Sequence, residues 1–73
     1  MTGGDRQHLE AAALSRLVHD LANPLSAVLA EAQLLLLDAE QLPTDAVASL
    51  KAIETAALRM RTILREAGAP RKP

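Results

Sequence analysis

Hydrophobic side chains recur along this chain at the three- and four-residue spacing of α-helices, in two segments separated by helix-breaking residues. The breakers are Gly3-Gly4 at the start, Leu42-Pro43-Thr44-Asp45 in the middle and Gly68-Ala69-Pro70 near the end. The segments between them lack glycine and are rich in Ala, Leu, Glu and Gln, which favour helices. The pattern predicts an all-α chain with helix one over about 5–40, a turn at 41–44, helix two over about 45–67 and a tail at 68–73.

Capping residues support these bounds. Asp5 is placed to cap helix one or to act as an anion in its first turn. Thr44 is the expected N-cap of helix two, with Asp45 near the positive end of the helix dipole. Gly68 is expected just beyond the last helical residue, where it would stop helix two.

Each predicted helix carries an apolar stripe at near-heptad spacing. The stripes comprise Leu14, Leu17, Leu21, Leu25, Val28, Ala32 and Leu35 in helix one, and Ala46, Leu50, Ile53, Ala57, Met60, Leu64 and Ala67 in helix two. Further apolar residues widen the stripes at their shoulders: Val18, Leu29, Leu36, Val47 and Leu58. Two helices alone would leave such wide stripes partly in water. We therefore expect an antiparallel helical hairpin that forms a homodimeric four-helix bundle.

Composition also favours association with a second chain. The 73 residues, with a mass of 7.8 kDa, allow one small domain, and its apolar residues include no Phe, Tyr or Trp. Cysteine is absent, which excludes disulfides and thiolate metal sites, and the two histidines lack the spacing of metal ligands. Of the usual ways in which a small chain gains stability, association remains.

Charge and hydropathy exclude other classes of partner. The net charge of −1 does not indicate nucleic-acid binding. The charges are unevenly distributed: residues 1–50 hold two basic and seven acidic side chains, and residues 51–73 hold six basic and two acidic ones. The longest apolar stretch, 21–37, contains a proline and several polar residues, so no membrane span is expected. The first ten residues do not resemble a secretory signal, and a cytoplasmic location is the expectation.

His19 and Asn23 are the residues most suited to chemistry. With the apolar stripe near 0°, they fall at about 140° and 180° around helix one, and four residues of spacing stack them on one solvent-facing surface. Small side chains near them would let another protein approach closely: Ser15, Ala22, Ser26, Ala27 and Ala30. A neutral, exposed imidazole is a nucleophile, so this surface is a candidate reaction site.

Pro24 lies inside the first helical pattern. It has no N–H to donate to the carbonyl of Asp20, and its ring crowds that carbonyl, so a kink is expected one turn after His19. The alternative is a break between two shorter helices. The apolar stripe, however, continues through the proline with a single stutter.

The string His19-Asp20-Leu21-Ala22-Asn23-Pro24-Leu25 resembles the H-box of bacterial sensor histidine kinases. That motif reads His, an acidic residue, Leu or Ile, Arg or Lys, Thr or Asn, Pro, Leu, and six of its seven positions agree. The resemblance extends over about residues 9–67. It implies a dimerisation and histidine-phosphotransfer domain of the HisKA type, which is an antiparallel hairpin that dimerises into a four-helix bundle and works in two-component signalling.

The resemblance also implies a role for each matching residue. His19 corresponds to the phospho-acceptor, Asp20 to the acidic neighbour that orients or deprotonates the imidazole, and Asn23 to the residue that positions water during dephosphorylation of the regulator. Pro24 corresponds to the proline that bends the helix. Ala22 departs from the usual Arg or Lys, which puts the contacts to the kinase catalytic domain in question.

The same resemblance implies the partners. A separate kinase catalytic domain, in cis or in trans, would hold ATP, so this chain is expected to bind no cofactor itself and not to be a self-sufficient enzyme. The receiver domain of a response regulator would accept the phosphoryl group on an Asp. Arg59, Arg61 and Arg65 belong to the His19 end of the expected bundle, where they could steer an acidic regulator or a phosphate.

Structural alternatives stand beside these roles. The arginines of helix two also fit a solvated surface near the helix C-terminus, and Asp20 could pair with Arg16 one turn earlier. Three functions follow: a phosphotransfer domain, a catalytically silent dimer of the same fold that binds a kinase or regulator as a scaffold or inhibitor, and a plain dimerisation hairpin.

Overall fold

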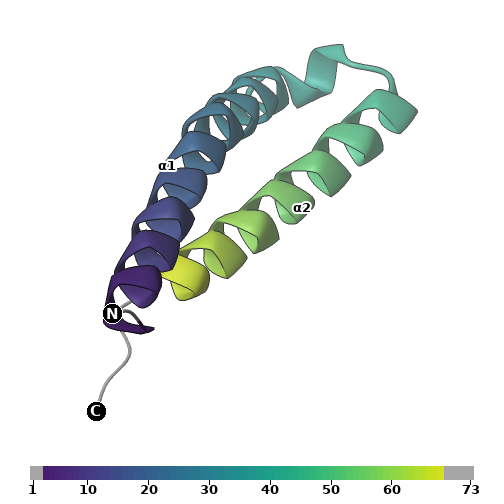
Figure 1. The fold of residues 1–73 in the computed structure, drawn as a ribbon. Coiled ribbons are helices and arrows are strands. Elements are labelled where there is room, and N and C mark those ends of the chain that lie inside the picture. The colour runs from purple at the N-terminus through teal and green to yellow at the C-terminus, as the bar shows by residue number, and fades with distance from the viewer. Residues whose placement is uncertain (1–2, 69–73) are drawn as a thin grey trace.

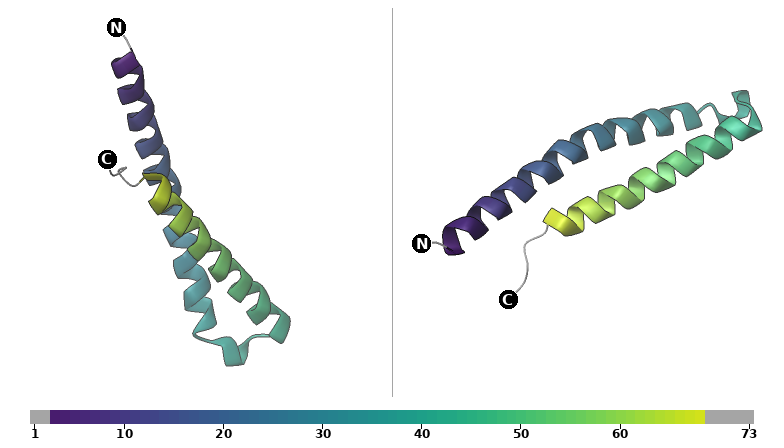
Figure 2. Two further views of the ribbon diagram at one scale, coloured as in Figure 1. Left: turned by 90° about the horizontal axis from the view of Figure 1, so that it is seen from below. Right: turned by 45° about the vertical axis from the view of Figure 1, so that its right-hand side comes forward.

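The computed structural model describes residues 3–68 and places them in two α-helices joined by a short 3-10 helix (Figure 1). Helix α1 spans Gly3–Leu36, the 3-10 helix η1 spans Ala39–Gln41, and α2 spans Thr44–Gly68. The two α-helices run antiparallel and side by side, with the connection at one end of the molecule (Figures 1 and 2). The predicted all-α helical hairpin is confirmed.

Helix α1 ends earlier than the predicted residue 40. The amide of Leu37 donates to the carbonyls of both Gln33 and Leu34, each at 3.2 Å, and the amide of Asp38 donates to Leu35 at 3.1 Å. The bonds to Leu34 and Leu35 span three residues instead of four, which tightens the last turn and leads into η1. Leu42 is extended, with ψ at 149°, as expected for a residue before proline. The connection therefore occupies residues 37–43 rather than 41–44.

The ends of α2 also differ from the predicted caps. Thr44 is the first residue of the helix rather than its N-cap, and the amide of Val47 donates to the carbonyl of Pro43 at 3.1 Å. Asp45 supplies the side-chain acceptor, because its Oδ1 receives a hydrogen bond from the amide of Ala46 at 3.0 Å. Gly68 is the last helical residue and does not stop the helix from outside; the rest of the predicted tail, 69–73, lies outside the described residues.

Pro24 lies within a continuous helix. Helix α1 passes through it without interruption, so the alternative of two shorter helices is wrong. Figure 2 shows α1 curving gradually along its length, in place of the sharp kink expected from the sequence. Pro24 and Asp20 are both exposed, so water can solvate the carbonyl of Asp20 that the proline leaves without its helical partner.

The core of the hairpin is small and wholly apolar. Its buried side chains, within the described residues, are Leu25, Leu29, Ala32 and Ala57. Leu58 and Leu64 of α2 are half-buried and pack against this cluster. The α1 surface that meets α2 continues in both directions through further half-buried residues: Val18, Ala22 and Leu36.

This contact surface is turned by about 40° around α1 from the predicted stripe. Most of the predicted stripe on α1 faces solvent in the hairpin, with Leu21 45% and Val28 50% exposed. Most of the predicted stripe on α2 is buried or half-buried, although Ile53 is 44% exposed. The expected shoulder residues Val18 and Leu29 instead face α2. The exposed members form one continuous surface, which we call the apolar face: Leu14, Leu17, Leu21, Val28, Leu35, Ile53 and Met60.

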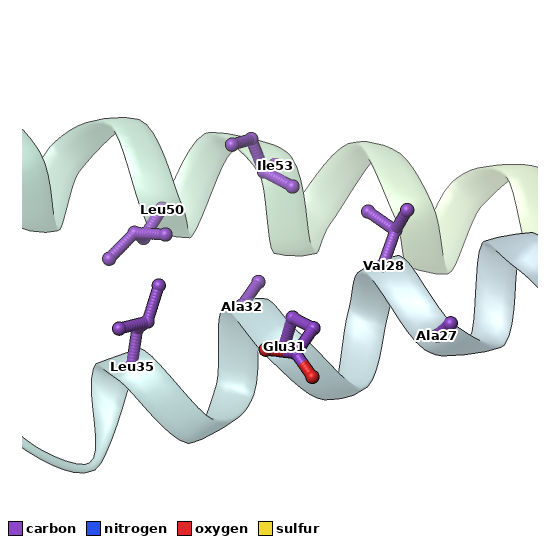
Figure 3. Close-up of a pocket in the computed structure, with 7 residues that line it drawn as sticks. All are labelled: Ala27, Val28, Glu31, Ala32, Leu35, Leu50 and Ile53. Atoms are coloured by element: carbon purple, nitrogen blue, oxygen red, sulfur yellow. The ribbon is translucent and has the colours of Figure 1, made fainter.

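A groove runs between the two helices on the apolar face (Figure 3). It encloses about 340 Å³ and is lined by Ala27, Val28, Glu31, Ala32, Leu35, Leu50 and Ile53. Figure 3 shows Leu35 and Val28 of α1 opposite Leu50 and Ile53 of α2, so its walls are almost entirely hydrocarbon.

Two contacts fix the register of the helices. A β-carbon at Gly68 would lie 3.3 Å from Cγ1 of Val18, and Nε2 of Gln33 donates to Oε2 of Glu54 at 3.1 Å. Since α2 ends level with Val18, the preceding turns of α1 extend past it, as Figure 2 shows. Residues 6–17 are accordingly exposed throughout.

Candidate functional site

The site is built on α1, one residue beyond the point where the end of α2 packs. Val18 is half-buried against α2 and His19, the next residue, is exposed. A helical step of about 100° turns His19 away from the line joining the helices and to the side opposite the apolar face. The predicted exposure of His19 and Asn23 is confirmed.

The surface around His19 is made of small and polar side chains. We call it the His19 face and define it by the exposed residues that share this side of α1: Ser15, His19, Asn23, Ser26 and Ala30. It contains no acidic residue.

Ala22 and Ala27, which the sequence suggested as part of the same surface, lie elsewhere. Ala22 is half-buried on the side of α1 that meets α2. Ala27 lines the groove on the apolar face, where Figure 3 shows it beyond Val28. The spacing of small residues alone could not separate these positions, because the direction from α1 to α2 was not known from the sequence.

Asp20 lies about 100° further around α1 than His19, so the two side chains leave the helix in different directions. Three side-chain hydrogen bonds occur within residues 6–68, and none involves His19, Asp20, Asn23 or Arg16: they join Gln33 to Glu54, Ala46 to Asp45, and Thr62 to Leu58. The anticipated pairing of Asp20 with Arg16 is therefore not seen as a hydrogen bond in this part of the chain.

The three candidate arginines of α2 do not share one side of the hairpin. Arg61 and Arg65 lie on the same side of α2 as Glu54. The hydrogen bond between Gln33 and Glu54 joins the two helices on the side of the hairpin away from the apolar face. This is also the side of His19. Arg59 points outward from the hairpin, about 160° from the direction of α1. All three side chains are exposed.

Sequence reasoning missed the link between Gln33 and Glu54 and the packing of Gly68 on Val18. Both pairs join residues far apart in the sequence, and neither helix pattern alone identifies its partner. The sequence feature that came nearest to predicting the register of the two helices was the length of the turn, since it placed His19 level with about Glu66. The observed register places His19 one residue later, level with Ala67.

No helix within the described residues is both long enough and apolar enough to cross a lipid bilayer. Across the same residues, no group of three or more His, Asp or Glu side chains is placed to hold a metal ion.

Comparison with known families gives a match over most of the chain. The family model described as His Kinase A (phospho-acceptor) domain, HisKA, matches residues 10–67. The matched range includes the string from His19 to Leu25 and nearly all of α2. Neither a curated protein nor a solved structure matches the chain significantly.

Proposed function

Because the chain belongs to the HisKA family of histidine kinase phospho-acceptor domains, we propose that His19 is its phospho-acceptor in a two-component signalling system. The observation that carries this proposal is the placement of the imidazole. His19 is exposed on the side of α1 opposite the apolar face, so a partner can reach it while that face is covered.

The proposed reaction has two transfers. In the first, a ring nitrogen of His19 attacks the γ-phosphorus of ATP held by a separate kinase catalytic domain, the bond from that phosphorus to the β,γ-bridging oxygen breaks, and ADP leaves. In the second, a carboxylate oxygen of a response-regulator Asp attacks the same phosphorus and the N–P bond breaks, which returns the electron pair to the imidazole. Such transfers depend mainly on positioning and on stabilising charge.

The neighbours of His19 have distinct proposed roles. Asp20 accepts or orients the imidazole proton, which requires a rotamer that turns its carboxylate toward the ring, because consecutive residues do not face each other on a helix. Asn23, one turn after His19, positions the water that hydrolyses the aspartyl phosphate of the regulator. Pro24 allows α1 to bend beside these residues.

Assembly is proposed to occur through the apolar face. Within the described residues, the hairpin buries four side chains and leaves several leucines, Val28 and Ile53 half exposed on one side. A second copy that covers this surface gives the homodimeric four-helix bundle expected for the family, and it leaves the His19 face open to the catalytic domain and the regulator.

The experiment uses the two histidines of the chain as a matched pair. The protein is incubated with radiolabelled ATP and a histidine kinase catalytic domain, or with a phosphorylated receiver domain. Wild type and His8→Gln should acquire an acid-labile, base-stable label, and His19→Gln should acquire none. Equal labelling of His8→Gln and His19→Gln would exclude His19 as the acceptor.

One observation favours a second candidate function. Ala22 stands where the family usually has Arg or Lys, so a chain that binds a kinase or regulator without carrying phosphate is the alternative. In that case the wild type would bind the partner in a pull-down assay but would stay unlabelled.

A further inference from the structure

We infer that Arg65 of α2 binds the phosphoryl group carried by His19, and thereby supplies positive charge to it from across the hairpin. The inference rests on the proposed function of His19 and adds a residue to its site. It is carried by the register of the two helices, the side on which each residue lies, and the charges on that side.

The register places Arg65 close to His19 along the helix axes. Gly68 is level with Val18, Arg65 precedes Gly68 by three residues, and His19 follows Val18 by one. At about 1.5 Å per residue in antiparallel helices, the two residues differ by about 3 Å along the axis. The hydrogen bond between Gln33 and Glu54 checks this register, because Gln33 follows Val18 and Glu54 precedes Gly68 by nearly the same distance, about 21–23 Å along the axis.

Both residues also lie on the same side of the hairpin. Gln33 and Glu54 meet on the side away from the groove of the apolar face. Around α2, Arg65 falls about 20° from Glu54, and around α1, His19 falls about 40° from Gln33. An arginine side chain is long enough to cross toward the imidazole over helices that are packed about 8–10 Å apart.

The half-buried α1 residues at this level are Val18 and Ala22. Ala22 lies about 60° around α1 from His19, on the side that meets α2, and presents only a methyl group there. Glu66, the nearest acidic residue on α2, lies about 100° around the helix from Arg65 and points outward. The charge that α2 places on this side of the hairpin near His19 is therefore positive.

The geometry singles out Arg65 among the three arginines. Arg61 lies on the same side but about 9 Å further along the axis from His19, level with Leu25. Arg59 points away from α1. A general electrostatic effect would involve all three residues, whereas a direct contact should depend on Arg65.

The chemistry suits a guanidinium. Two of its N–H groups can donate to two non-bridging oxygens of the phosphoryl group, and no covalent bond to Arg65 is made or broken. The contact stabilises the charge on those oxygens while the phosphorus is transferred to or from the imidazole nitrogen.

The test uses potassium phosphoramidate, a small donor that phosphorylates exposed imidazoles without any kinase. The full chain is treated at constant pH, and mass spectrometry gives the ratio of the phosphorylation rates of His19 and His8. His8 lies 11 residues earlier on α1, beyond the end of α2, and serves as the internal reference. Helicity is checked by circular dichroism for every variant.

Arg65→Gln should lower the His19 to His8 ratio about tenfold, whereas Arg59→Gln and Arg61→Gln should change it less than about twofold. Arg65→Lys should give an intermediate ratio, because it keeps the charge but loses the two-pronged contact. In the background of Arg65→Gln, the change Ala22→Arg should restore most of the rate.

Equal effects of the three Gln variants, or no effect of Arg65→Gln, would overturn the inference. These outcomes are distinguishable from failure of the proposed function. Phosphoramidate reports on Arg65 even if no kinase labels His19, whereas the kinase assay with His19→Gln reports on His19 alone.

Discussion

Gly68 lies directly against Val18, where a β-carbon on residue 68 would come within 3.3 Å of Cγ1 of the valine. This contact holds the last turn of α2 beside the residue that precedes His19. Val18 is β-branched and half-buried, so its side chain has little freedom to move aside.

The first prediction is that Gly68→Leu forces the end of α2 away from α1. Overpacking of this kind costs about 1–3 kcal/mol, and each kcal/mol lowers the Tm of a chain of this size by roughly 4–8 °C. Thermal unfolding followed by circular dichroism at equal protein concentration measures the effect. Glu66→Leu places the same side chain on the exposed, outer side of α2 and should lower the Tm much less.

The second prediction concerns assembly. Val28 is 50% exposed in the hairpin and lies at the centre of the apolar face, so Val28→Asp should leave the single hairpin folded but raise the Kd of the dimer more than about a hundredfold. Sedimentation equilibrium measures this change. Ala30→Asp introduces the same charge on the His19 face and should leave a dimer; equal dissociation of both variants would show that the apolar face is not the interface.

The third prediction tests the core within one hairpin. Leu29 is 5% exposed, so Leu29→Ala should destabilise the fold by about 2–5 kcal/mol. With four buried side chains in the described residues, the hairpin has little stability to lose, and this variant should be largely unfolded in far-ultraviolet circular dichroism. Leu34→Ala removes the same atoms from a residue that is 57% exposed and should retain helicity close to that of the wild type.

The fourth prediction concerns the polar link between the helices. The hydrogen bond from Gln33 to Glu54 is exposed, so water replaces either partner when the other is removed. A double-mutant cycle with Gln33→Ala and Glu54→Ala should give a coupling energy below about 1 kcal/mol. A coupling energy of several kcal/mol would show that this side of the hairpin is covered in solution.

The fifth prediction separates the proposed roles of the histidine and the asparagine. Asn23→Ala should leave phosphorylation of His19 within about twofold of wild type, because Asn23 lies one turn further along α1, and should slow dephosphorylation of the regulator at least about tenfold. Release of inorganic phosphate from a phosphorylated receiver domain measures this activity. Equal loss of both activities would assign Asn23 a structural role.

The hairpin could be predicted from the sequence because Pro43 marks the connection and no glycine interrupts the chain between Gly4 and Gly68. The glycines at the ends, Gly3, Gly4 and Gly68, are themselves helical, so they mark the ends of the helices only approximately. The surface by which α1 meets α2 could not. Two apolar stripes overlap on α1, and both contain Leu25 and Ala32. Leucine and alanine populate both stripes, so periodicity does not decide which one faces α2.

The exposure of His19 and Asn23 was predicted more accurately than the core. His19 and Asn23 lie far enough around α1 that a rotation of about 40° leaves both in solvent. Ala22 lies nearer the contact surface, and the same rotation brings it into the surface that meets α2, whereas Ala27 lines the groove on the apolar face. The side on which each arginine of α2 lies depended on the register, which the bond between Gln33 and Glu54 defines.

The groove between Val28, Leu35, Leu50 and Ile53 has a practical consequence, because the chain has no aromatic side chain to serve as a fluorophore. A solvatochromic dye such as anilinonaphthalene sulfonate should enter this hydrocarbon-lined space in a separated hairpin and brighten. Pairing of two hairpins over the groove would expel the dye, so the decrease in emission on raising the protein concentration would follow association in real time.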